Sequence, residues 1–362
     1  MESRKIQMPV VAAKADREHQ PEGEVWVGVR TPGTESSMRS EAIRAALTAA
    51  GASILEPVSH PESCLLEVHD ERLLEWLEQA HREWLEAGLD RNPGQDRVVP
   101  YIFPTPGLLD GIPAFEPTAA SARAGAWAYD TMTLIGPGTW PAARAAADVA
   151  LTAADLVRGG SPAAYALCRP PGHHATRSAI GGSCYLNNAA IAAAHLSGDV
   201  PVGVLDIDAH HGNGTQSIFF ADPHVLTASV HVDPARGWFP HFLGFEAETG
   251  RGSGRDSNRN RTLAPGSGDE VWLESITGQL DWLAEGGVGF LVVALGLDAA
   301  AGDPEGPFEV TGDGYREAGR LIGLLGVPTV FVQEGGYALE RLGELLTATL
   351  TGFEEGLAST AA

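Results

Sequence analysis

The chain has 362 residues, of which 44% are hydrophobic and 20% charged, and its formal net charge is -23. This composition is typical of a globular protein with a sizeable core, and we expect a single domain. The negative charge argues against nucleic acid as a direct partner and favours cationic ligands.

The two ends of the chain are predicted to lie outside this domain. Residues 1–23 are polar and lack a continuous apolar stretch, so we expect a disordered segment without a signal peptide or membrane anchor. Residues 353–362 are expected to form a tail. No apolar run reaches the length of a transmembrane helix, so no membrane contact is expected. Cys64, Cys168 and Cys184 lack disulfide-type spacing, which suits a reducing cytoplasm.

Between the ends, apolar runs alternate with amphipathic stretches, and this rhythm predicts a parallel sheet flanked by helices. The later apolar runs are nearly continuous, as in strands buried on both faces. The predicted strands are 25–29, 53–55, 165–168, 202–207, 225–231, 288–295 and 329–332. The predicted helices lie near 37–50, within 61–87, and near 141–157, 187–196, 269–284, 312–325 and 338–350. The fold class is therefore α/β, with a central, mostly parallel sheet.

Two long segments interrupt the alternation. Residues 91–118 are rich in proline, glycine and aromatic residues, and such a long loop in a compact domain is usually functional or disordered. Residues 231–265 contain several glycines and are expected to run over the surface near the strand that ends at His231.

Polar side chains follow two of the predicted strands. Asp206, Asp208 and His210 come after the apolar residues 202–205, and Asp298 follows the apolar residues 292–297. Ligands of open α/β sheets bind beyond the carboxyl ends of the strands, and alternation puts Asp208 and His210 on one side. One such carboxylate alone would be weak evidence, because carboxylates at strand ends often cap the next helix. Together, two carboxylates and one imidazole can hold a zinc ion with a position open for water.

Two further patterns carry chemistry. His173 and His174 follow a proline-glycine turn that can bend both rings into one cavity, where imidazoles suit acid and base catalysis. Tyr337 follows Glu334 and two glycines after the last predicted strand, and its phenol can point into the same cleft.

These motifs together resemble the signature blocks of histone deacetylases. The similar blocks are residues 169–175, 181–188, 206–215, 296–306 and 334–337. Residues 138–140, 239–244 and 248–254 are most similar to bacterial acetylpolyamine amidohydrolases, which are related to class II deacetylases. The resemblance extends over residues 24–352 with matching order and spacing. It implies an arginase-like or deacetylase-like fold and hydrolysis of acetylated amines to acetate and free amine.

The resemblance implies a role for each motif residue. Asp208, His210 and Asp298 match the zinc ligands, although the sequence does not choose between zinc and ferrous iron. His174 matches the general base and later acid, and His173 matches its electrostatic partner. Tyr337 matches the phenol that stabilises the oxyanion. The two residues that orient the histidines are Asp206, for His173, and Asn213, for His174.

The resemblance also implies one or two structural potassium sites. The residues that match the site near the zinc are Asp206, Asp208, His210, Ser229 and Val230. The residues that match the more distant site are Phe219, Asp222 and Val225.

Four residues match the substrate tunnel and its mouth. Phe239 matches one apolar wall, and the carbonyl of Gly182 can accept from the substrate amide. Ser183 departs from the family, whose members carry phenylalanine or tyrosine there, so a wider and more polar tunnel is expected. Glu305 matches a glutamate that selects cationic substrates in polyamine-selective relatives.

The loop at 91–118 matches the one through which acetylpolyamine amidohydrolases dimerise and narrow their entrance, so we expect a homodimer. The acidic residue that those enzymes present to the polyamine aligns approximately with Ser121, which leaves Asp110 or Glu116 as substitutes.

Several functions remain open on sequence alone. The leading one is deacetylation of acetylpolyamines or similar small cationic amines. The alternatives are a protein acetyl-lysine deacetylase, favoured by Ser183, and an inactive acetyl-lysine binding module, which the intact Tyr337 disfavours. An arginase-like dinuclear enzyme would need further carboxylates that the sequence lacks.

Overall fold

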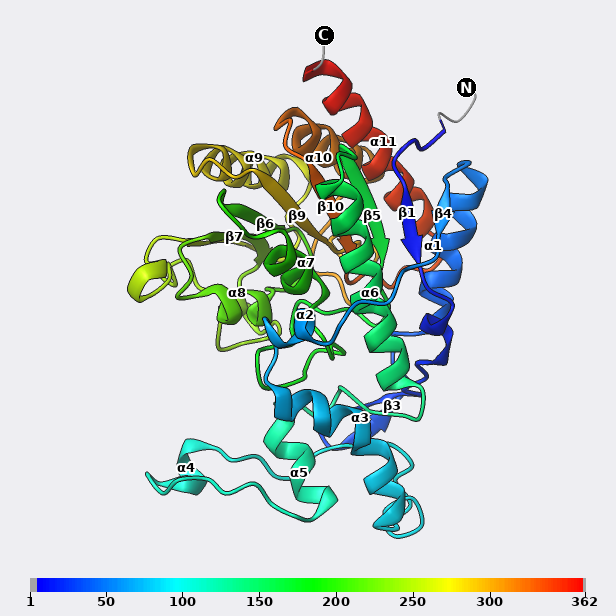
Figure 1. Cartoon of the computed structure of the whole chain (residues 1–362), viewed down its shortest axis with the longest axis vertical. Helices are drawn as coiled ribbons and strands as arrows, with labels where there is room; N and C mark the ends of the chain where they lie inside the picture. The colour runs from blue at the N-terminus through cyan, green and yellow to red at the C-terminus, as the bar shows by residue number, and fades with distance from the viewer. Residues whose placement is uncertain (1–4, 361–362) are drawn as a thin grey trace.

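The computed structural model describes residues 5–360 and contains one eight-stranded sheet in which all neighbouring strands run parallel (Figure 1). The strand order is β4-β1-β5-β10-β9-β6-β7-β8. These strands are β1 (Val10–Ala12), β4 (Ile54–Leu55), β5 (Ala163–Leu167), β6 (Val202–Asp206), β7 (Val225–Val232), β8 (Asn258–Leu263), β9 (Phe290–Leu295) and β10 (Thr329–Gln333). The prediction of an α/β fold with a central parallel sheet is confirmed.

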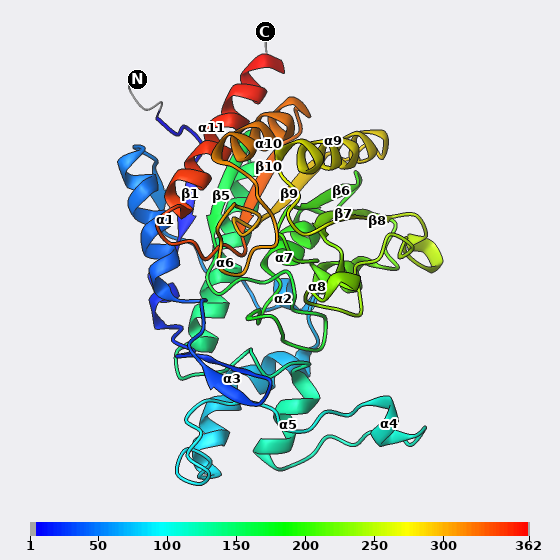
Figure 2. The ribbon, with the colours of Figure 1, turned by 180° about the vertical axis from the view of Figure 1, so that it is seen from behind.

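Helices lie on both faces of the sheet. The α-helices are α1 (Ser37–Ala49), α2 (Ser63–Leu66), α3 (Glu71–Glu86), α4 (Pro106–Leu109), α5 (Ala120–Trp127), α6 (Thr139–Arg158), α7 (Asn188–Leu196), α8 (Asn213–Phe219), α9 (Asp269–Glu285), α10 (Gly312–Leu324) and α11 (Leu342–Thr360). Short 3-10 turns are Ala15–Glu18, Pro234–Arg236 and Gly252–Gly254. Helices α6 and α7 cover one face, and α1, α9, α10 and α11 cover the other, as Figures 1 and 2 show from opposite sides.

The central strands are buried on both faces, which is why they read as continuous apolar runs. In β9, Val292 and Ala294 belong to the core under α6 and α7, whereas Leu291 and Val293 belong to the core under α9 to α11. Alternate side chains of an extended strand point to opposite faces, so both faces need apolar residues when both are covered.

The prediction of a disordered N-terminal segment was wrong for the described part of it. Residues Val10–Ala12 form β1, which pairs with β4 on one side and β5 on the other. All three side chains are buried. A three-residue apolar run gives almost no local signal, and only the two flanking strands define this element. Residues 1–4 lie outside the described residues.

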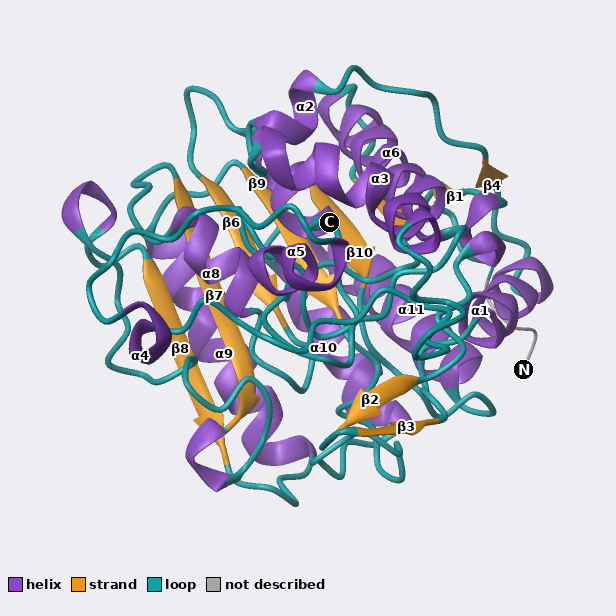
Figure 3. Cartoon of the chain, turned by 90° about the horizontal axis from the view of Figure 1, so that it is seen from below, coloured by secondary structure: helices purple, strands orange, loops and turns teal. Residues whose placement is uncertain are grey.

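Two further predictions need correction. The predicted strand at 25–29 is a hairpin of β2 (Glu24–Trp26) and β3 (Val29–Thr31), apart from the main sheet in Figure 3, because Val27 and Gly28 turn the chain with positive φ. The predicted tail from residue 353 instead continues α11 to Thr360, and Phe353 packs against Phe331 of β10. Residues 361–362 lie outside the described residues.

The two long segments differ from each other. Residues 91–118 begin against the body of the molecule, where Val98 is buried and bridges to Ile135. The part around α4 projects from the body (Figures 1 and 2). Large apolar side chains such as Tyr101 and Phe115 are exposed in this part. Residues 231–265 pass over the surface and then form the edge strand β8. Within residues 5–360, no helix is long and apolar enough to cross a membrane.

Candidate active site at the carboxyl ends of the strands

Two acidic residues and a histidine meet where β6 and β9 end. Asp208 and His210 follow β6, and Asp298 follows β9, which is its neighbour in the sheet. The ligand atoms of the three side chains all lie within 4.8 Å of one another. His210 Nδ1 is 3.0 Å from Asp298 Oδ2 and 3.4 Å from Asp208 Oδ1. The structure therefore brings together the three residues that the sequence predicted as metal ligands.

Backbone N–H groups hold both carboxylates of this cluster. Gly335 N donates to Asp208 Oδ2 at 2.8 Å, and Ala209 N donates to Asp298 Oδ1 at 2.9 Å. Both carboxylates are buried, and burial together with the charge of Asp208 raises the pKa of Asp298 to about 7. Two buried anions this close repel each other unless a cation lies between them. The donor set fits a divalent metal ion.

His173 is paired with Asp206 behind this cluster. Its Nδ1 lies 3.0 Å from Asp206 Oδ2. Burial alone would lower the pKa of His173, but the charges of Asp208 and Asp206 outweigh it and raise the pKa to about 10. Glu334 accepts hydrogen bonds from Gly172 N at 2.6 Å and His173 N at 3.1 Å. These bonds fix the turn that carries the two histidines.

His174 lies beside His173, with the ring centroids 3.9 Å apart, and it is held by Asn213. His174 Nδ1 is 2.8 Å from Asn213 Oδ1. Burial and the charge of His173 lower the pKa of His174 well below its ordinary value, so the ring is neutral near pH 7. Phe239 meets the ring edge-to-face at 4.7 Å. Glycine is required at Gly182, because a Cβ there would lie 2.3 Å from the ring.

Tyr337 is fixed by contacts to its backbone and its ring. Asp303 Oδ2 accepts from Tyr337 N at 2.7 Å and from Ala338 N at 2.9 Å. Arg39 of α1 lies over the phenol ring at 4.7 Å and donates from Nε to the carbonyl of Gly336 at 2.6 Å. Burial raises the pKa of Tyr337 well above its ordinary value. The phenol therefore stays protonated and can donate a hydrogen bond.

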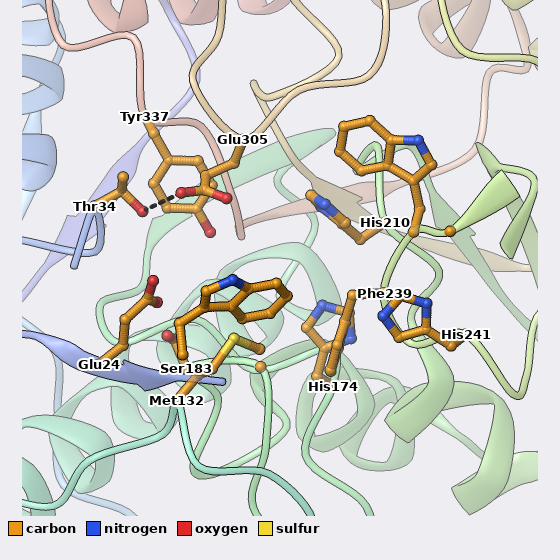
Figure 4. Close-up of a pocket in the computed structure, with 14 residues that line it drawn as sticks. Glu24, Thr34, Met132, His174, Ser183, His210, Phe239, His241, Glu305 and Tyr337 are labelled. Carbon is orange, nitrogen blue, oxygen red and sulfur yellow. Dashed lines mark hydrogen bonds between the residues drawn. The ribbon is translucent and has the colours of Figure 1, made fainter. Parts of the chain in front are cut away.

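A pocket of about 330 Å³ opens onto these side chains (Figure 4). His174, His210 and Tyr337 line it. The predicted substrate-binding residues also line it, and they are Gly182, Ser183, Phe239 and Glu305. The sequence patterns give no role to seven further lining residues, which are Glu24, Trp26, Thr34, Met132, Gly237, Trp238 and His241. His241 lies in the block 239–244, whereas the other six lie outside the motifs, and only their tertiary placement identifies them.

Two carboxylates make the pocket anionic. Glu305 accepts from Thr34 Oγ1 at 3.1 Å, and Figure 4 shows Glu24 on the same side of the pocket. Burial and the charge of Glu305 raise the pKa of Glu24. Among the described residues, neither carboxylate forms an ion pair with a basic side chain. The pocket therefore offers uncompensated negative charge to a ligand.

The wall near Ser183 is held in a tight turn. Gly182 and Ser183 both have positive φ, and their N–H groups donate to Asp130 Oδ2 at 2.6 Å and Thr133 Oγ1 at 2.9 Å. Met132 lines the pocket together with Ser183 (Figure 4). The expected effect of Ser183 on tunnel width stays a prediction.

The positions considered for an acidic contact from the loop do not line this pocket. Ser121, Asp110 and Glu116 are not among the residues that line the pocket. Glu116 instead forms ion pairs with Arg72 and Arg123. Within one chain, Glu24 is the acidic residue that faces the pocket together with Glu305.

The residues predicted to bind potassium fall in two places. Asp206 and Ser229 are register partners in β6 and β7, and Val230 follows in β7. Phe219 ends α8, and its carbonyl accepts from Asp222 N at 2.9 Å in the turn that leads to Val225. Oxygen atoms that can bind potassium are thus present in both places, and potassium binding stays a prediction.

Comparison with known proteins agrees with this geometry. The histone deacetylase domain matches residues 33–353. The chain is 37% identical over 348 residues to the acetylpolyamine amidohydrolase of Mycoplana ramosa, covering 95% of this chain and 99% of that one. It is 41% identical over 305 residues to the acetylpolyamine amidohydrolase of Burkholderia pseudomallei, covering 84% and 86%.

A solved structure agrees as well. The crystal structure of acetylpolyamine aminohydrolase from Burkholderia pseudomallei matches with a TM-score of 0.89 and 37% identity, over 97% of this chain and 99% of that one. The chain therefore belongs to the histone deacetylase family and is a hydrolytic deacetylase.

Proposed function

We propose that this protein hydrolyses the amide of small, cationic N-acetylated amines, with acetylpolyamines as the preferred substrates. The observation that carries the proposal is the single pocket that joins a predicted metal cluster, two histidines and a phenol to two carboxylates. Relatives named as acetylpolyamine amidohydrolases support the substrate class.

Asp208, His210 and Asp298 would hold a zinc ion, because carboxylate oxygens and imidazole nitrogens are zinc ligands and three protein ligands leave a position open. The ion would supply Lewis acidity toward the acetyl carbonyl and toward water. The same set can bind ferrous iron.

The protein residues supply proton transfer and charge stabilisation. Neutral His174 accepts a proton from the attacking water and returns it to the nitrogen as the C–N bond breaks, releasing acetate and amine. His173, paired with Asp206, provides positive charge nearby. The phenol of Tyr337 donates to the oxygen that becomes negative during attack, a contribution typically worth about 3 kcal/mol of barrier.

Glu305 and Glu24 favour a substrate that carries ammonium groups beyond the acetylated nitrogen. A carboxylate that meets an ammonium group in a partly desolvated site gains a charge-assisted hydrogen bond. The net charge of -23 adds long-range attraction for cations.

The projecting loop supports assembly into a homodimer. Ile112 and Phe115 expose 68% and 90% of their surface, and exposed apolar patches of this kind mark interaction sites. Three unpaired cysteines suit a cytoplasmic location. Structural potassium at the two places described above is part of the same proposal.

The test compares kcat/KM of the zinc-loaded protein for acetylspermidine, acetylputrescine, acetylcadaverine and an acetyl-lysine peptide. We expect the acetylpolyamines to be the best substrates. Higher kcat/KM for the peptide would favour a protein deacetylase instead, and the absence of any hydrolysis would favour a binding module.

A further inference from the structure

Tyr129 follows α5, and no sequence motif marks it, yet it contacts both His174 and Asn213. Its hydroxyl oxygen lies 2.9 Å from the carbonyl oxygen of His174 and 3.3 Å from Asn213 Nδ2. Asn213 Oδ1 lies 2.8 Å from His174 Nδ1. The three residues form a closed ring of hydrogen bonds beside the pocket.

The direction of each hydrogen bond follows from the number of hydrogens available. A carbonyl oxygen can only accept, so the single hydroxyl hydrogen of Tyr129 points to the carbonyl of His174. The hydroxyl must then accept from its second neighbour, which requires the NH2 group of Asn213 on that side. Asn213 therefore turns its oxygen toward His174 Nδ1, and that nitrogen must donate.

This direction decides the tautomer of His174. With the hydrogen on Nδ1, the neutral ring leaves Nε2 free to accept a proton. The reversed amide would put its NH2 group against Nδ1 and move the ring hydrogen to Nε2. A carboxylate at position 213 would need no such control, because both of its oxygens accept.

The ring of Tyr129 is itself held in place. It stacks with Phe239 at 6.3 Å and 17° between planes. It also fills the space beside Gly181, where a Cβ would lie 2.1 Å from Tyr129 Cζ. Burial raises the pKa of the phenol well above its ordinary value, so the hydroxyl keeps its hydrogen.

We propose that Tyr129 is a positioning residue that locks the amide of Asn213 and so keeps His174 in the tautomer that can accept a proton. The expected effect on catalysis rests on the proposed role of His174 as general base. The expected effect on the tautomer of His174 does not depend on that role.

The test is a double-mutant cycle with Tyr129→Phe, which removes one oxygen and keeps the ring against Phe239. We expect kcat for acetylspermidine to fall about ten-fold, because a buried NH2 group without an acceptor favours the reversed amide. KM and zinc content should change less than about two-fold. In the Asn213→Asp background, Tyr129→Phe should lower kcat less than about two-fold, because a carboxylate needs no lock.

Nitrogen-15 NMR of the histidine side chains of the zinc-loaded protein reads the tautomer independently of activity, with His174→Ala used to assign the signals. The expected result is hydrogen on Nδ1 of His174 in the unmodified protein and its movement to Nε2 in Tyr129→Phe.

Two outcomes would overturn the proposal. Equal losses of kcat in both backgrounds would mean that Tyr129 acts only through packing. An unchanged tautomer of His174 in Tyr129→Phe would mean that Tyr129 does not control the orientation of the Asn213 amide. If His174→Ala keeps full activity while the tautomer still responds to Tyr129→Phe, the lock stands and the proposed role of His174 fails.

Discussion

His210 Nδ1 lies 3.0 Å from Asp298 Oδ2, although 88 residues separate the two along the chain. The two residues follow β6 and β9, which are neighbours, and parallel strands end at the same edge of a sheet. The contact follows from the strand order, and it leads to the first prediction.

Replacing Asp208 or His210 with alanine should remove metal binding and hydrolysis together, because each change deletes one of three predicted ligands. Metal analysis and an acetylspermidine assay on the same samples check this. Glu285→Gln, which alters an exposed carboxylate at the end of α9, is the control for zinc content. Variants of Asp208 or His210 that keep full zinc occupancy would refute the ligand assignment.

Tyr337→Phe should retain metal and substrate affinity but lower kcat by roughly two to three orders of magnitude, as expected for the loss of one oxyanion donor. Burial keeps the phenol protonated, so the effect should not depend on pH below about pH 9. Steady-state kinetics measure kcat and its pH dependence, and zinc analysis measures metal retention. A near-normal kcat would remove Tyr337 from the mechanism.

Glu305→Leu should lower kcat/KM for acetylspermidine by about ten-fold or more, which corresponds to about 1.5–3 kcal/mol for a charge-assisted hydrogen bond. Activity on a neutral acetylated amine should stay level or rise. Glu285→Gln, at the exposed end of α9, removes the same charge far from the pocket and controls for overall electrostatic attraction. Equal responses of both substrates to Glu305→Leu would rule out a selective role.

The projecting loop should control assembly through its exposed apolar side chains. Phe115→Ser combined with Ile112→Ser should convert dimers to monomers without unfolding, because these side chains are largely exposed within one chain. Light scattering after gel filtration measures the mass, and circular dichroism checks the fold. An unchanged mass in solution would count against a dimerisation role for this segment.

Acid stability should depend on Glu35. Its carboxylate is buried, with Oε1 2.8 Å from Arg169 Nε and Oε2 3.0 Å from Arg169 Nη2. Burial alone would raise the pKa of Glu35, but the charges of Arg169, His19 and Arg39 outweigh it and hold the pKa well below its ordinary value. The unfolded chain, with a glutamate pKa of about 4.3, therefore takes up a proton more readily than the folded protein.

The stability that Glu35 provides is thus present above about pH 4.3 and is lost as the pH falls further. Near pH 6, Glu35→Gln should destabilise the fold by about 3 kcal/mol, because it leaves buried arginine unpaired. The difference between the two proteins should shrink near pH 3. Urea unfolding at both pH values measures it, and a difference that is independent of pH would show that Glu35 acts through packing alone.

The sequence by itself determined the fold class, most of the strands and the three residues that meet in the candidate metal cluster. Strands such as β6 and β9 are buried on both faces, so their composition is apolar throughout and identifies them without knowledge of the fold. Asp208, His210 and Asp298 follow such strands directly, and the geometry of parallel sheets brings strand ends together.

Only the tertiary structure decided β1, the β2–β3 hairpin and the positions of Glu24 and Tyr129 beside the site. Val10–Ala12 is too short to identify locally and becomes a strand because β4 and β5 satisfy its backbone on both sides. Glu24 and Tyr129 reach the site from segments with no motif of their own. Their contacts depend on side-chain directions and distances between elements remote in sequence, which local residue patterns do not encode.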